Sequence, residues 1–78
     1  MTRFELLREL EQISDSPSGS LADATKLKAL KQWDSLAVVS FIAIADEKLG
    51  LTLDAGAVAK AVTVSDLVQL VDNHLSAG

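Results

Sequence analysis

The chain has 78 residues, with eleven acidic and seven basic side chains, one histidine and no cysteine. A chain of this length buries only about 60–65% of the surface of its unfolded state, so it holds one small core and no deep catalytic cavity. Without cysteine it forms no disulfide or thiolate metal site, and a single histidine argues against a histidine metal site. We expect a single domain over residues 1–78, without a metal ion and without catalytic activity of its own.

The net charge lies in the second part of the chain. Residues 1–33 carry five acidic and five basic side chains, whereas residues 34–78 carry six acidic and two basic ones and hence the whole net charge of −4. An acidic protein with few aromatic residues repels phosphate backbones, so we expect no nucleic-acid partner. The longest apolar run is shorter than the roughly 20 residues that span a bilayer, and the charged N-terminal residues do not resemble a secretory signal. We therefore expect a cytoplasmic protein.

Residues 3–13 are expected to form the first helix. Thr2 is a suitable N-cap, and Glu5, three residues later, completes a capping-box pattern. Apolar side chains recur at helical spacing, with polar ones between them. The apolar set is Phe4, Leu6, Leu7, Leu10 and Ile13, and the polar set is Arg3, Glu5, Arg8, Glu9, Glu11 and Gln12.

A long loop is expected over residues 14–33. It opens with SDSPSGS, which contains the only proline of the chain and is rich in turn-forming residues. Loops of this length are unusual in a small domain, and they are often functional or contain a short helical turn. We expect Leu21, Leu27 and Leu30 to hold this loop on the core.

Residues 35–49 are expected to form the second and most apolar helix. Asp34 is placed as its N-cap, and Gly50 is placed as the residue that ends it. A second apolar set, Leu36, Val39 and Ala43, lies on another face and exceeds what the core needs. The stripe that should face the core consists of Val38, Phe41, Ile42, Ala45 and Leu49.

Two further helices complete the predicted fold. A short one over residues 54–60 begins at Asp54. The last one, over residues 64–75, follows Thr63, which forms a second capping-box pattern with Asp66. The sequence thus predicts an all-α fold, a small antiparallel four-helix bundle with three main helices plus a short third helix.

Ser35 is the first candidate for chemistry. A serine at a helix start commonly acts as a cap, but Asp34 already supplies one, which leaves Ser35 free to point outward. A phosphate group on its oxygen would lie at the positive end of the helix dipole, beside free N–H groups. A hydrolytic role is disfavoured, because the one available pair, His74 with Asp72, comes without a nucleophile elbow or an oxyanion loop.

The order and spacing of several motifs resemble those of the acyl carrier protein family. The resemblance extends over essentially the whole chain and has no gap between residues 33 and 75. The motifs are Asp34-Ser35-Leu36 at a helix start after a long loop, the acidic pair Asp46 and Glu47 near the end of that helix, and, after a short helix, Thr63-Val64 at the start of the last one.

The resemblance implies a function for Ser35. In this family a magnesium-dependent phosphopantetheinyl transferase moves phosphopantetheine from coenzyme A onto that serine, and Asp34 would help to dock the transferase. The thiol of the 4′-phosphopantetheine arm then carries an acyl group as a thioester, which would give a chain without cysteine a thiol. The implied protein is a discrete, non-catalytic and monomeric carrier, which presents acyl intermediates to acyl-loading and acyl-processing enzymes of a fatty-acid, polyketide or other specialised pathway.

The sequence departs from the family pattern on the expected partner face. Many fatty-acid carriers have acids two and five residues after the modified serine, where this chain has Ala37 and Ser40, and Lys48 follows the acidic pair. Trp33 before the motif is not a general family feature either. We therefore expect a specialised carrier that docks mainly through apolar contact. The expected partner face comprises Leu36, Val39, Ala43, Asp46 and Glu47.

Two alternatives remain open from the sequence. An aminoacyl or peptidyl carrier would use the same arm, although peptidyl carriers more often have glycines and a His or Asp before the serine, where this chain has Lys31-Gln32-Trp33. An unmodified helical interaction domain would use the same apolar face only to bind a partner. The identity of the cargo is not encoded in any of these motifs.

Overall fold

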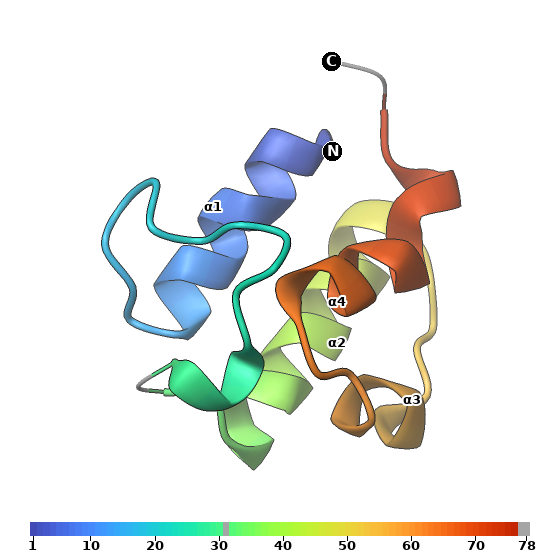
Figure 1. Ribbon diagram of the computed structural model, residues 1–78. Helices are drawn as coiled ribbons and strands as arrows, with labels where there is room; N and C mark the ends of the chain where they lie inside the picture. The colour runs from blue at the N-terminus through green and yellow to red at the C-terminus, as the bar shows by residue number, and fades with distance from the viewer. Residues whose placement is uncertain (31, 77–78) are drawn as a thin grey trace.

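The structure is a computed structural model that describes residues 1–30 and 32–76, and over these residues it is all-helical (Figure 1). No strand occurs among them, which confirms the predicted all-α class and is compatible with a small helical bundle. Lys31, which falls in the predicted loop, lies outside the described residues. In chain order the elements are α1 Arg3–Ile13, η1 Leu27–Ala29, α2 Ser35–Leu49, α3 Ala55–Ala59, α4 Val64–Val71 and η2 Asp72–His74, where η denotes a 3₁₀ turn.

The ends of α1 and α2 are those predicted from their capping residues. The Glu5 backbone nitrogen donates to Thr2 Oγ1 at 3.1 Å, and the Thr2 backbone nitrogen donates to Glu5 Oε1 at 2.9 Å. The second bond lowers the pKa of the Glu5 carboxyl, because it stabilises the charged form. α2 follows Asp34 and ends before Gly50, whose φ of 63° lies in the left-handed region that favours a residue without a Cβ atom.

α3 is the short helix predicted around residues 54–60, one residue shorter at each end. Asp54 is its N-cap, with Oδ2 accepting the Ala57 backbone N–H at 3.0 Å. Lys60 keeps a helical backbone but acts as the C-cap. α3 contacts α2, so this short element lies against the most apolar helix of the protein.

α4 begins as predicted and ends earlier than predicted. Thr63 and Asp66 form the expected capping box, and the N–H groups of Val62 and Thr63 lower the pKa of the Asp66 carboxyl. The α-helix stops at Val71 rather than at residue 75, and the chain tightens into η2. Beyond η2 the chain pairs with its own first residues, because the Ser76 backbone nitrogen donates to the Met1 carbonyl at 2.8 Å.

One hydrophobic core joins α1, α2, α3 and α4. On α2 the buried line is Ala37, Phe41 and Ala45, whereas the predicted residues Val38, Ile42 and Leu49 are only half-buried beside it. The predicted stripe therefore contains two of the three buried residues, Phe41 and Ala45, but it omits Ala37. The other buried apolar residues of the core are Leu6, Leu10, Leu21, Leu27, Val58, Val64, Leu67, Val68 and Val71.

The loop over residues 14–33 is held by backbone pairing with the connection between α3 and α4. The Leu27 nitrogen donates to the Val62 carbonyl at 2.9 Å, and the Val64 nitrogen donates to the Thr25 carbonyl at 2.9 Å. Leu21 and Leu27 are buried and Leu30 is half-buried, as predicted. The loop also contains a short helical turn, η1, as long loops in small domains often do.

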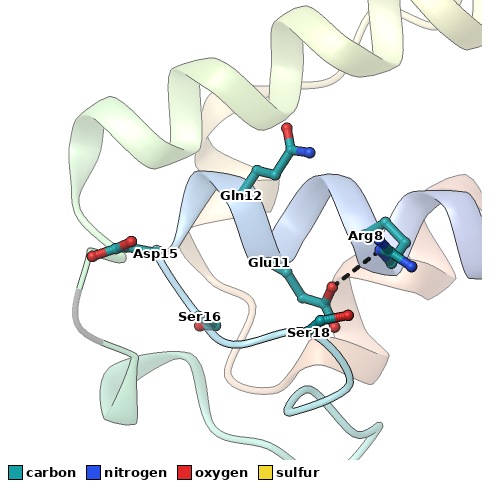
Figure 2. Close-up of a pocket in the computed structure, with 6 residues that line it drawn as sticks. All are labelled: Arg8, Glu11, Gln12, Asp15, Ser16 and Ser18. Atoms are coloured by element: carbon teal, nitrogen blue, oxygen red, sulfur yellow. Dashed lines mark ion pairs between the residues drawn. The ribbon is translucent and has the colours of Figure 1, made fainter.

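Glu11 is a buried acid on α1, whereas the sequence placed it among the polar residues between the apolar ones. Its residue is only 6% exposed, and its Oε2 accepts the Gly19 backbone N–H at 2.6 Å. Arg8 lies 3.5 Å from Glu11 Oε1, as the dashed line in Figure 2 shows. Because the Arg8 side chain is half-exposed, that ion pair contributes little, and the buried Glu11 carboxylate ties α1 to the loop through its bond to Gly19.

Replacement of Glu11 is expected to loosen this loop. Glu11→Ala should lower the free energy of unfolding by about 1.5–3 kcal/mol, the range for a hydrogen bond to a charged group. Glu11→Gln should lose less, because its amide oxygen still accepts the Gly19 N–H. Urea unfolding followed by circular dichroism measures both. Glu47→Ala, which removes an exposed acid of α2, is the matched control, and equal losses in Glu11→Ala and Glu47→Ala would contradict this account.

Candidate functional site

The start of α2 presents Ser35 to solvent. Asp34 has an extended backbone, and its Oδ1 accepts the Ala37 backbone N–H at 3.0 Å, so the cap of the helix comes from Asp34. Ser35 is the first helical residue and is exposed. Its hydroxyl is therefore not needed for the cap and lies where an enzyme can reach it.

A pocket of about 490 Å³ lies beside Ser35, between the start of α2 and the short helix α3. Asp34 is the one charged residue in its lining, and it stands at the helix start. The remaining side chains are apolar apart from the hydroxyl of Ser35 itself, so a group attached to Ser35 would have an apolar surface within immediate reach. The lining consists of Trp33, Asp34, Ser35, Val38, Val39, Ala55 and Ala59.

The expected partner face of α2 is exposed throughout. Leu36 is 72% exposed and Val39 is 61% exposed, so this face of α2 presents two large apolar side chains to solvent. Ala43, Asp46 and Glu47 are exposed as well. Because Val39 also lines the pocket beside Ser35, this face and the pocket are continuous.

The prediction that Ala37 makes the partner face less acidic is wrong. Ala37 is only 3% exposed and belongs to the core, so the absence of an acid at this position does not make the exposed face less acidic. Ser40, the second position without an acid, is half-buried. The apolar character of the face therefore comes from Leu36 and Val39 rather than from these two positions.

The structure does not bring His74 and Asp72 into the pocket beside Ser35. Both residues lie in η2, after α4, and neither is among the residues that line that pocket. In Figure 1 η2 lies near the N-terminus of the chain, whereas the start of α2 lies at the opposite edge of the molecule. The arrangement gives no support to a serine hydrolase site.

A second pocket, of about 390 Å³, lies where α1 meets the following loop. Figure 2 shows the Glu11 side chain turned towards Arg8 and Ser18, with Asp15 pointing away. Of the two acids that line this pocket, Glu11 is already bound by Gly19 and Arg8, so its role is structural. Within residues 1–30 and 32–76 no group of three or more His, Asp and Glu side chains is placed to hold a metal ion.

No helix among the described residues is long and apolar enough to cross a membrane. Comparison with protein-family models, with curated proteins and with solved structures found no match to the chain.

Variants of Asp34 are expected to show that its hydrogen bond caps α2. Asp34→Ala should lower the free energy of unfolding by about 1 kcal/mol, the usual loss for an N-cap. Asp34→Asn should change it by only a few tenths of a kcal/mol, because asparagine caps a helix about as well as aspartate does. Denaturant titrations at neutral pH compare the two. Equal losses from both variants would contradict the capping role and point to the charge instead.

Proposed function

We propose that the chain is a discrete carrier protein, which bears acyl intermediates as thioesters on a 4′-phosphopantetheine arm attached to Ser35. The observation that carries this proposal is the combination of an exposed serine, a cap supplied by its neighbour Asp34 and an apolar pocket beside the attachment point. The all-helical fold with a short third helix is compatible with the resemblance to acyl carrier proteins.

The proposed modification is a phosphoryl transfer in which the protein is the acceptor. The Ser35 hydroxyl gives its proton to a base of the transferase, and its oxygen forms a bond to phosphorus while a phosphoanhydride bond of coenzyme A breaks and adenosine 3′,5′-bisphosphate leaves. The phosphodiester formed on Ser35 carries a negative charge at the first residue of α2. The N-terminal N–H groups and the helix dipole favour an anion there.

The proposed partner surface is the exposed face of α2. Leu36 and Val39 supply apolar area next to Ser35, and Asp46 and Glu47 supply charge near the other end of the helix. A transferase or an acyl-processing enzyme with an apolar depression and a basic rim would fit this surface. Apolar burial should dominate, because the two acids lie away from the attachment point.

An unmodified interaction domain is the rival function, since the exposure of Leu36 and Val39 would also suit a protein that only binds a partner. An aminoacyl or peptidyl carrier is the second alternative, and it would hold its cargo on the same phosphopantetheine arm.

Coexpression with a broad-specificity phosphopantetheinyl transferase tests the attachment. Intact-mass measurement should show one phosphopantetheine added to the wild type and none added to Ser35→Ala. Ser18→Ala, which alters an exposed loop serine, is the matched control and should gain the same mass as the wild type. Asp34→Asn should be modified about tenfold more slowly while it keeps its fold, because it loses the charge that docks the transferase.

Two results would overturn the assignment to Ser35. One is a folded wild type that gains no mass, which would favour the unmodified interaction domain. The other is a Ser35→Ala variant that still gains it, which would move the attachment elsewhere.

Partner binding is expected to depend more on apolar contact than on charge. Leu36→Ala should weaken binding to a cognate acyl-processing enzyme by about tenfold, as for a side chain near the centre of an interface. Between about 0.05 M and about 0.5 M salt, affinity should change by less than about threefold. Val62→Ala, which removes an exposed apolar side chain outside α2, should have no effect. A steep fall of affinity with salt, with Leu36→Ala unchanged, would contradict this prediction.

A further inference from the structure

Trp33 is the only tryptophan of the chain, and it stands two residues before Ser35. It is half-buried and packs against the hydrophobic core, and it also lines the pocket beside Ser35. One part of this residue therefore contributes to the core, while another part forms a wall of an open pocket. A residue that served only the core would not need to contribute to the pocket.

The other walls of this pocket match an uncharged, apolar guest. Val38 and Val39 supply branched apolar side chains from α2, and Ala55 and Ala59 keep the α3 side of the pocket free of bulk. The large flat indole of Trp33 offers more apolar contact area than any other side chain in the lining. The pocket can therefore hold a compact apolar group that is tethered close by.

This inference rests on the proposed function and concerns the arm itself. In phosphopantetheine, a methylene group follows the phosphate, and the next carbon is quaternary and bears two methyl groups. The phosphate would be attached to Ser35, which itself lines the pocket, so the dimethyl group is tethered within reach of the pocket. Transfer of these methyl groups from water to the indole surface is favourable.

We propose that Trp33 is a positioning residue for the prosthetic arm, whose indole holds the dimethyl section of phosphopantetheine in the pocket between α2 and α3. The bound section gives the arm a preferred direction where it leaves α2. The distal part with its thiol stays free to reach partner enzymes. In this account the tryptophan orients the arm and takes no part in any reaction of the thioester.

Nuclear magnetic resonance of the modified protein tests this contact directly. The protein is first modified with isotope-labelled arm, and intact mass confirms the addition. Nuclear Overhauser effects are then expected between the indole ring protons and the two methyl groups. The ring current of Trp33 should shift the methyl signals upfield from their positions in free coenzyme A.

Three variants distinguish a contact between Trp33 and the arm from an effect of Trp33 on the stability of the fold. In Trp33→Phe the upfield shift should fall to about half, and in Trp33→Ala it should disappear, because the aromatic ring current is weaker or absent. Val62→Ala, outside the pocket, should leave the methyl signals unchanged. If Trp33→Ala fails to fold, the wild type and Trp33→Phe still show whether the aromatic ring contacts the methyl groups, since the Overhauser effects are measured on folded protein.

The outcomes distinguish this inference from the function on which it rests. If the added mass is confirmed and the methyl signals coincide with those of free coenzyme A, the role of Trp33 is overturned while the carrier function stands. If no mass is added, the carrier function fails, and the role of Trp33 fails with it.

Discussion

Ala37 is the residue on which the geometry of the site depends. Its backbone N–H is held by the Asp34 carboxylate at 3.0 Å, and its side chain is buried in the core. The start of α2 is thereby fixed twice, once by the cap and once by packing. Successive residues of a helix are rotated by about 100°, so Ser35, two residues earlier, lies on nearly the opposite side of α2. Burial of Ala37 therefore implies exposure of Ser35.

The same constraint orders the rest of α2. The line of Ala37, Phe41 and Ala45 is spaced at four residues and is packed into the core. Leu36 and Val39 consequently project outward, although they are as apolar as the residues inside. An apolar helix in a small protein cannot bury its whole circumference, and the exposed remainder here lies next to Ser35 and its pocket. In the proposed function, this exposed apolar surface is the one that partner enzymes contact.

Much of this could be predicted from the sequence, because the decisive signals are local. Thr2 with Glu5 and Thr63 with Asp66 mark helix starts by hydrogen bonds within one turn, and Gly50 marks a helix end by its left-handed backbone. These signals need no knowledge of the tertiary fold. The exposure of Ser35 followed in the same way, from the capping residue immediately before it.

The predictions were wrong or incomplete where contacts between distant parts of the chain determine the structure. α2 is apolar on nearly every side, so spacing alone could not show that Ala37 rather than Val38 belongs to the buried line. Glu11 is buried because the loop passes over it and donates the Gly19 N–H, and no pattern within α1 indicates that. After α4 the chain pairs with its own first residues, a long-range contact that the spacing within the last helix does not indicate. The pocket beside Ser35 requires α3 to lie against α2, and sequence spacing does not show that contact.

The central claim is that Ser35 bears the arm in the cell. The most direct measurement is tandem mass spectrometry of the protein purified from the cells that make it, with and without prior treatment with hydroxylamine. The account predicts a phosphopantetheine phosphodiester on the peptide that contains Ser35, together with an acyl mass that hydroxylamine removes from the thiol. A native protein whose Ser35 is unmodified throughout would contradict the account.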